Sequence, residues 1–440
     1  MTVQPGKGSL LNTLLSVWVL LFFTGMIFHF RAVSSISTGL LLITGLICYQ
    51  KKTVSLLFRS PFSPFLISCF LYYLYTVINL LVKDNTAVIQ SQFEMKSALL
   101  LVPVAISCIG FVGAKQLRRL MKYFVLILLT ASLYCLLIAV NTWIRTGDDN
   151  IFFYHALVSP LNQHAVFFSF LLFFSLIYIL EYGTGIDFFR INKWDSILAV
   201  FFSILLILLA SKLILFCCLL YLFYYFLKNK SGKMKKGWLL LIMTFLLLIA
   251  FTKNPVSNRF REIVQTNWAS LDREQFDEAD YLNGLQFRYL QWKLVPRILN
   301  EKHAWVTGLG EERGKAALQD QFKQRHLYSG QPGTADQGYL IYNTHNQLLQ
   351  SLLTGGLAAV LLFLMICGSL LYLILKGKKT LVTVTVLSLL LFSVTESCFE
   401  TQYGLLFFTF LPVFSVVLTN QLPGKQIHSR TTTDPLPAIE

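Results

Sequence analysis

The feature that most limits how this chain can fold is a series of apolar stretches, about 16 to 30 residues each, that recurs along nearly its whole length. An α-helix rises 1.5 Å per residue, so about 20 apolar residues cross the roughly 30 Å hydrocarbon core of a bilayer. Hydrophobic residues make up 55% of the 440 residues and charged residues only 13%, which is too apolar for an ordinary soluble domain. The chain is therefore predicted to be an all-α membrane protein that crosses the bilayer many times.

We predict about twelve spans, at residues 9–29, 33–50, 64–82, 97–113, 121–143, 163–181, 195–210, 212–227, 237–252, 346–375, 380–398 and 403–419. The seventh and eighth are the least regular, because residues 195–227 form one apolar run interrupted only at Ala210, Ser211 and Lys212. A single long buried helix is the alternative there.

The distribution of basic residues favours two crossings in that run, because short cytoplasmic loops retain Lys and Arg. With the N-terminus inside, 20 basic residues fall in cytoplasmic segments and five in short outer segments. The five outer residues are Arg31, Lys83, Lys96, Arg145 and Lys212. Both chain termini are then expected to face the cytoplasm.

Segment 253–342 is the exception to the apolar pattern and is predicted to be exported. The segment holds 12 Lys and Arg against 11 Asp and Glu, so it is nearly neutral. The formal net charge of +15 therefore lies mainly beside the spans, where basic residues contact anionic lipid headgroups, and a nucleic-acid partner is not expected. Helices are expected at about 284–300 and 312–325, joined through a turn at 308–310. We divide the chain into an N-terminal membrane part (1–252, about nine spans), the loop (253–345), a C-terminal membrane part (346–420, about three spans) and a cytoplasmic, disordered tail (421–440).

Polar residues in or beside membrane spans are costly to bury, so each is a candidate for function. The topology places a group of them on one side of the membrane, at span ends or in the loop. The group comprises Asn162, Gln163 and His164 before the sixth span, Lys212, Arg288, His345, Glu396 and Glu400.

Each candidate also has a purely structural interpretation. Lys212 could anchor a helix end, Arg288 could be a solvated charge, His345 could cap the tenth span, and Glu396 and Glu400 could pair with basic loop residues; for His155, Asn162 and His164 a structural role is the default. We find no zinc-ligand spacing, P-loop, GxSxG elbow or carboxylate-rich metal loop. No cofactor or metal is predicted, and a reaction that relies on Arg and Lys is the simplest enzymatic interpretation.

Several motifs occur in a fixed order: NGLQFRYLQW at 283–292, GLG at 308–310, YNTHNQ at 342–347 and Gly355-Gly356, with YHAL at 154–157, Ser211-Lys212 and TES at 395–397. In this combination the chain resembles the O-antigen ligase and O-antigen polymerase family of bacterial membrane glycosyltransferases. The resemblance covers about residues 150–410. Lys212 stands where many family members have Arg, although Lys also binds phosphate as a point charge.

The resemblance implies a GT-C-like helical fold in the bacterial inner membrane with a large, partly helical periplasmic loop. It implies a glycan donor on undecaprenyl diphosphate and transfer to a sugar hydroxyl of lipid A-core or of a growing glycan. Arg288 and Lys212 would bind the diphosphate, with His345 as general base beside Arg288 in the catalytic site. Supporting roles are expected for His155, Trp292, Asn346, Glu396 and Glu400. Ligase and repeat-unit polymerase remain open, and a transporter or lipid flippase and a receptor or scaffold are the competing classes.

Overall fold

In the computed structural model the described residues are 5–59, 62–185, 194–228, 282–331, 333–334 and 336–422, with scattered positions between 257 and 280. These residues form helices and connecting turns and contain no strand. The helices are α1 (Pro5–Ile27), α2 (Arg31–Arg59), α3 (Ser63–Lys83), α4 (Thr86–Lys96), α5 (Ala98–Ser107), α6 (Ala114–Thr146), α7 (Tyr154–Val158), α8 (Ala165–Tyr182), α9 (Trp194–Leu208), α10 (Lys212–Lys228), α13 (Gly284–Glu301), α14 (Glu311–Gln324), α15 (Gln347–Gly377), α16 (Thr380–Thr395) and α17 (Gln402–Gln421). Short 3₁₀ turns include η3 (Ser159–Leu161) and η6 (Cys398–Glu400).

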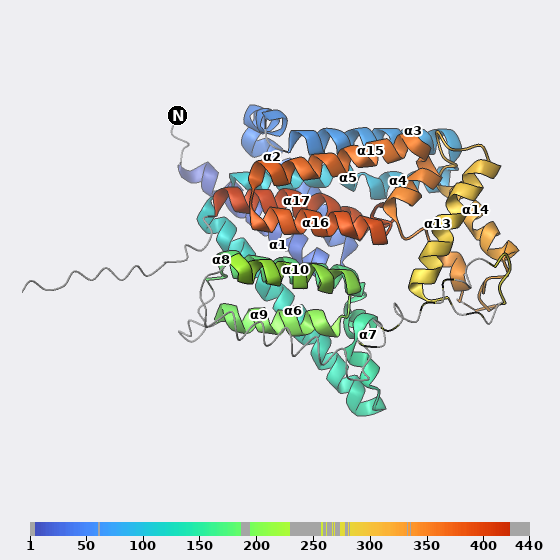
Figure 1. Cartoon of the computed structure of the whole chain (residues 1–440). Coiled ribbons are helices and arrows are strands. Elements are labelled where there is room, and N and C mark those ends of the chain that lie inside the picture. The colour runs from blue at the N-terminus through green and yellow to red at the C-terminus, as the bar shows by residue number, and fades with distance from the viewer. Residues whose placement is uncertain are drawn as a thin grey trace, which may run out of the picture.

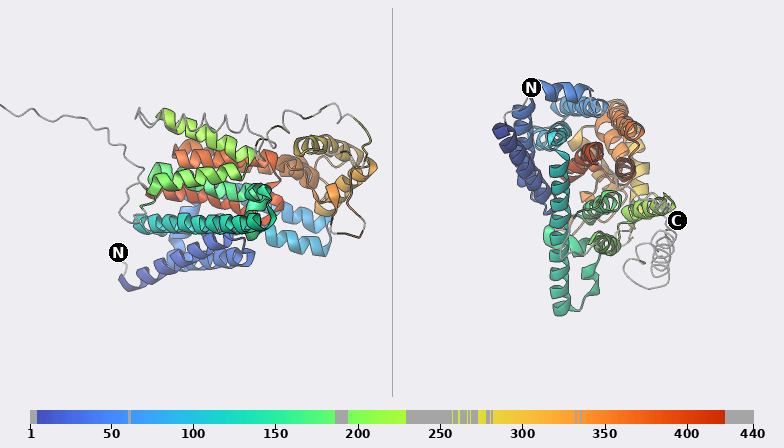
Figure 2. Two further views of the ribbon diagram at one scale, coloured as in Figure 1. Left: turned by 90° about the horizontal axis from the view of Figure 1, so that it is seen from below. Right: turned by 90° about the vertical axis from the view of Figure 1, so that its left-hand side faces the viewer.

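The long helices lie side by side in one bundle, and α13 and α14 lie beyond one end of it (Figures 1 and 2). We call this the loop end and the opposite one the far end. Polar contacts hold helix termini together at both: Gln163 donates to the carbonyl of Met26 at 2.7 Å at the loop end, and Gln116 donates to that of Asn12 at 3.0 Å at the far end. Helix α1 therefore runs from the far end to the loop end, and α6 begins at the far end beside the start of α1.

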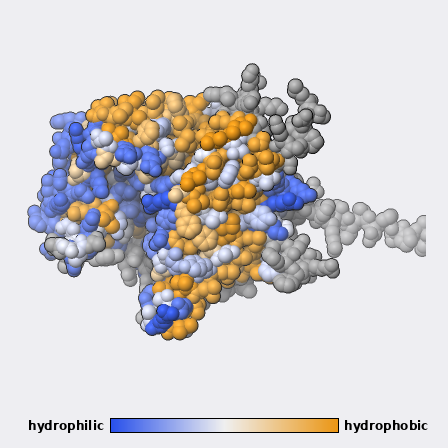
Figure 3. Space-filling model, turned by 180° about the vertical axis from the view of Figure 1, so that it is seen from behind, coloured by the Kyte–Doolittle hydropathy of each residue, from blue (hydrophilic) through white to orange (hydrophobic). Residues whose placement is uncertain are grey.

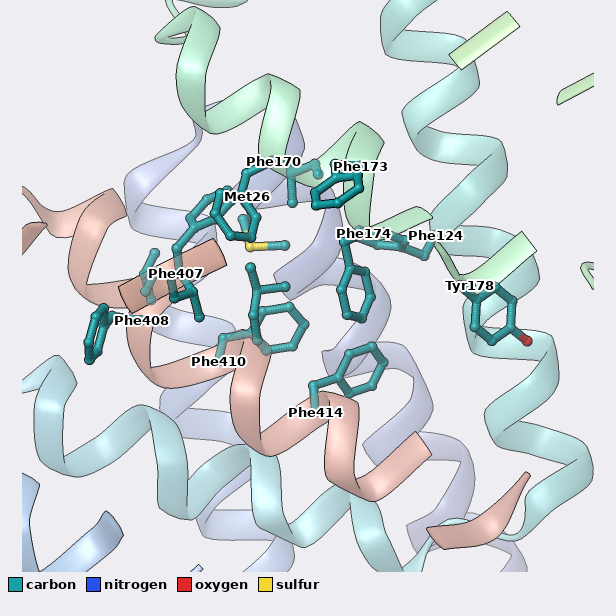
Figure 4. Close-up of a cluster of buried hydrophobic side chains, with 14 of the residues drawn as sticks. Met26, Phe124, Phe170, Phe173, Phe174, Tyr178, Phe407, Phe408, Phe410 and Phe414 are labelled. Atoms are coloured by element: carbon teal, nitrogen blue, oxygen red, sulfur yellow. The ribbon is translucent and has the colours of Figure 1, made fainter. Parts of the chain in front are cut away.

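Helix α17 forms the centre of the bundle, with nearly every residue buried. Its aromatic side chains pack against those of α1, α6 and α8 (Figure 4). Phe410 and Phe414 stack with ring centroids 4.9 Å apart, and Phe23 meets Phe124 edge-on at 4.8 Å. Such contacts fill the interior with large apolar side chains, which favours close helix packing.

The outer surface of the bundle is apolar as well, with exposed side chains such as Ile43, Leu81, Leu137 and Leu361. Figure 3 shows this apolar surface over the bundle and a hydrophilic surface over the end that carries α13 and α14. Water would strongly disfavour so much exposed apolar area, whereas lipid chains match it. The prediction of an all-α, multi-pass membrane protein is confirmed at this level.

Seven helical segments among the described residues are long and apolar enough to cross a membrane: Leu10–Ile27, Ser63–Lys83, Thr86–Gly110, Ala114–Thr146, Ala165–Tyr182, Gln347–Gly377 and Gln402–Gln421. Shorter apolar helices cover Arg31–Ile47, Trp194–Leu208 and Thr380–Thr395. The total of twelve spans stays a prediction, and the ninth, at 237–252, lies outside the described residues, as does most of the tail from 423.

The structure decides two local points. The run 195–227 is two helices, α9 and α10, separated at Leu209–Ser211, so the single-helix alternative is wrong. The short outer segment predicted before the fourth span contains a helix, α4, which continues into α5 after Ser97. Lys96, expected among the outer basic residues, is only 2% exposed.

The turn between α13 and α14 packs directly on a break in α15. Gly356 has φ +67° inside that helix, and the amide of Leu357 donates to the carbonyl of Trp305 at 2.8 Å. Leu309 and Gly310 donate in turn to carbonyls of α15, each at 2.9 Å. A side chain at Gly308 or Gly356 would collide with the opposing backbone, so the two glycine motifs are required by this close approach.

Candidate functional site

The start of α13 is fixed by a capping box that the sequence encodes locally. The side chain of Asn283 accepts from the amides of Leu285 and Gln286 at 3.0 Å, and the Gln286 side chain accepts from the Asn283 amide at 3.0 Å. Phe287 is buried against Phe322, with ring centroids 5.3 Å apart. This anchoring positions the next residue, Arg288, at the edge of the bundle.

The segment 343–347 forms a tight turn that leads into α15. Its Asn343 side chain accepts from the amide of His345 at 3.0 Å, and His345 has φ +45°, which is unusual for a residue with a side chain. Asn346 caps α15 by accepting from Leu349 at 3.1 Å and also donates to the carbonyl of Val394 at 3.1 Å. Asn346, and not His345, therefore caps this helix, and the alternative that His345 is the cap is wrong.

Buried hydroxyl and amide groups fix this turn from below. Thr344, which is fully buried, contacts the Gln350 side chain at 3.1 Å and the Ser397 hydroxyl at 3.2 Å. Gln347 accepts from the amide of Phe399 at 2.7 Å. The turn before α15 and the connection after α16 thus form one hydrogen-bonded unit.

Arg288, His345 and Glu396 meet at the loop end, where Glu396 follows the last residue of α16. One oxygen of Glu396 accepts from the Arg288 guanidinium at 2.8 Å, and the other lies 2.9 Å from His345 Nδ1. All three side chains keep about a quarter of their surface exposed (21–27%). Sequence topology predicted that they share one side of the membrane, and the structure brings them into direct contact.

The electrostatics of this cluster favour an ionised Glu396. Burial raises the pKa of its carboxyl, but the hydrogen bond from His345 and the charges of His345, Arg288 and His164 outweigh burial and hold the pKa below its usual value. Because the carboxylate can only accept, Nδ1 of neutral His345 carries the proton, and Nε2 is left as the basic nitrogen. Arg288 keeps donor capacity, since its buried Nε has no hydrogen-bond partner among the described residues.

Lys212 is the first residue of α10, and its end of the bundle follows from contacts at the other terminus of that helix. Lys228, at the end of α10, forms an ion pair of 3.6 Å with Glu181 near the end of α8. Since α8 begins at the loop end, after His164, α10 also begins there. Lys212 therefore lies at the same end as Arg288 and His345.

Glu400 belongs to a second, separate buried ion cluster. Lys96 of α4 forms an ion pair with Glu311 of α14 and lies 3.6 Å from Glu400. Burial and the neighbouring Glu311 carboxylate raise the pKa of Glu400 to about 7, although Lys96 acts in the opposite direction. This cluster holds α14 against the bundle. The sequence did not predict the pairing of Lys96 with Glu311, because the two residues are far apart in the chain.

The remaining predicted residues divide between the two regions. Trp292 is 38% exposed, one turn beyond Arg288, and forms no hydrogen bond with the cluster in the described residues. His155 accepts from the amide of Ala165 at 3.3 Å, which joins α7 to the start of α8. Among the described residues no group of three or more His, Cys, Asp and Glu side chains is arranged to hold a metal ion.

Asp84 is a further residue that sequence reasoning missed. Its carboxylate accepts from the amides of Glu311 and Glu312 at 3.2 and 2.9 Å, so it caps α14 from another helix. Lys83 donates to the carbonyl of Gly308 at 2.8 Å. The two charged residues Lys83 and Asp84, directly after a predicted span, were the feature of the sequence that could have indicated this contact with α14.

Residues 197–364 match the family model described as O-antigen ligase. This segment, which is less than half of the chain, is similar to that family. The matched segment includes Lys212, Arg288 and His345, whereas Glu396 lies beyond its end. A comparison with curated proteins finds no match. The resemblance to the O-antigen ligase and polymerase family is thus confirmed over this segment.

Proposed function

We propose that the protein transfers a glycan from undecaprenyl diphosphate to a sugar hydroxyl at the periplasmic face of the bacterial inner membrane. The observation that carries the proposal is the contact of His345 and Arg288 with one carboxylate, Glu396, at the loop end. The family match supports a lipid-linked glycan as donor. The apolar bundle suits a polyprenyl tail, which must remain in lipid while its diphosphate reaches the site.

His345 is assigned as the general base. Glu396 holds Nδ1, so Nε2 accepts the proton of the attacking hydroxyl, and the resulting imidazolium is stabilised by the carboxylate. The hydroxyl oxygen bonds to the anomeric carbon as the bond from that carbon to the diphosphate oxygen breaks. A single displacement of this kind inverts the anomeric centre and needs no metal.

Arg288 and Lys212 are assigned to the diphosphate. Negative charge grows on the leaving group as its bond to the sugar breaks, and cationic groups at that position lower the barrier. Arg288 has donor capacity beyond its bond to Glu396. Lys212 lies at the same end of the bundle and supplies a second positive charge.

The test uses purified protein, a lipid-linked glycan donor and lipid A-core or a growing glycan as acceptor. His345→Ala and His345→Gln should both lose transfer by about 10²- to 10⁴-fold while donor binding persists, because glutamine cannot take the proton at neutral pH. Wild-type rates in the glutamine variant at saturating donor would make His345 a positioning residue. The acceptor that is used distinguishes a ligase from a repeat-unit polymerase.

A further inference from the structure

A pocket of about 630 Å³ opens at the loop end, beside the cluster but without any residue of α13. Its wall comes from the α1–α2 turn, the α7–α8 turn, α4 and the start of α17. The residues that matter here are His29, Arg31, His155, His164, Gln402 and Tyr403. Three of the seven histidines of the chain therefore gather at one pocket.

Backbone contacts determine which nitrogen of each imidazole can donate. The amides of Ala165 and Val166 donate to Nδ1 of His155 and His164, each at 3.3 Å, so in the neutral rings Nε2 carries the proton. His29 is the reverse case: its Nδ1 donates to the carbonyl of Asn162, and its Nε2 is buried. Besides the histidines, the wall holds Arg31 as a donor, Glu94 as an acceptor and Gln402, whose amide can do both.

The charges and rings of the pocket indicate which ligand class it suits. Arg31 lines the same wall as Glu94 and Glu400, and two carboxylates would oppose an anion. Phe167 and Tyr403 add aromatic surface, with ring centroids 6.3 Å apart. Groups that donate, groups that accept and aromatic faces together match a saccharide, whose hydroxyls do both and whose ring faces are apolar.

The position of the pocket connects it to the proposed base. His164, which lines the pocket, is near enough to Glu396 to act on it electrostatically, and Glu396 in turn holds His345. A saccharide in this pocket would therefore lie next to Glu396 and His345, on the side of the cluster away from α13, which contributes no residue to the wall.

We propose that this pocket binds the acceptor saccharide and directs its reacting hydroxyl toward His345. The assignment rests on the proposed transferase function. A second pocket of similar size lies between α4 and α14. Its wall includes Gln92, Lys315 and Gln319, and also Asn343, which accepts from the amide of His345, so this pocket borders the cluster as well. That pocket is the competing location for the acceptor and supplies a matched control.

The kinetic test measures KM for donor and acceptor separately. Gln402→Leu and Arg31→Met should each raise the acceptor KM about fivefold or more, the value of one lost hydrogen bond, with donor KM and kcat changed less than about twofold. Lys315→Met, in the second pocket, should leave both KM values unchanged. A rise in acceptor KM for Lys315→Met alone, or a rise in donor KM for the first two variants, would overturn the assignment.

A binding test that needs no turnover separates failure of this proposal from failure of the proposed function. The full-length protein in lipid nanodiscs is photolabelled with a diazirine-tagged core oligosaccharide released from lipid A by mild acid. Label is expected on peptides that contain residues 155–164 or 401–403, and the Arg31→Met, Gln402→Leu double variant should lose it. Label confined to residues 311–319 or 341–343, which line only the second pocket, or label displaced by the donor glycan alone, refutes an acceptor site here whether or not transfer is detected.

Discussion

Replacing Glu396 by glutamine tests the central claim that one carboxylate serves both Arg288 and His345. The substitution keeps the shape of the side chain and its capacity to accept from His345 Nδ1, but it removes the negative charge. The ion pair with Arg288, now 2.8 Å, becomes a neutral hydrogen bond, and the imidazolium formed during transfer loses its counter-charge.

The size of the effect follows from the geometry. A hydrogen bond to a charged group contributes about 1.5–3 kcal/mol, so losing the charge opposite the imidazolium should lower kcat by about 10- to 200-fold. Protein stability should fall by less than about 1 kcal/mol, because both partners are about a quarter exposed and such ion pairs are screened by solvent. The expected phenotype is a folded protein that binds donor and transfers slowly.

The assay measures initial transfer rates at saturating donor and acceptor, with thermal unfolding of the same samples as the check on folding. Glu396→Asp is the matched control. Its side chain is one methylene shorter, but it keeps the negative charge, so it should retain more activity than Glu396→Gln. If Glu396→Gln transfers at the wild-type rate, the carboxylate has no role in proton transfer. If it unfolds, Glu396 is mainly structural.

Three further predictions concern other parts of the molecule. Gly356→Ala should lower the melting temperature, because its Cβ would lie 2.4 Å from the Val306 backbone and the φ of +67° alone costs about 1–3 kcal/mol for alanine. Gly368→Ala is the control: it lies in the same helix with open space around it and should leave the melting temperature unchanged. Glu400 has a pKa of about 7 in the folded protein against 4.5 ordinarily, so the folded state binds more protons than the unfolded state between these values. Stability should therefore fall as pH rises from about 5 to 7. Glu400→Gln should flatten this dependence in melting curves recorded across that range. Lys212→Ala should reduce transfer without reducing stability and Lys212→Arg should retain it; full activity of Lys212→Ala would remove this residue from the diphosphate site.

Part of the candidate site was predictable because its local structure depends on residues close together in the sequence. The capping box at 283–286 and the turn before α15 depend on neighbours two to four residues away, so Arg288 and His345 were found from their motifs. Glu396 and Glu400 were both expected to support the site, yet only Glu396 contacts Arg288 and His345. Nothing in the local sequence distinguishes these two carboxylates, because their partners, Arg288 and Lys96, come from remote helices.

The sequence by itself determined the class of fold, since apolar runs of membrane length dictate helices and caps and turns set where many of them end. Only the tertiary structure decided which helices pair at the loop end. It showed that Lys96 is buried between two carboxylates, and that Gly308 and Gly356 let two backbones meet. The physical reason is range: hydropathy and capping act within a few residues, whereas the shared carboxylate of Glu396 joins residues 51 and 108 positions away, and only packing brings them together.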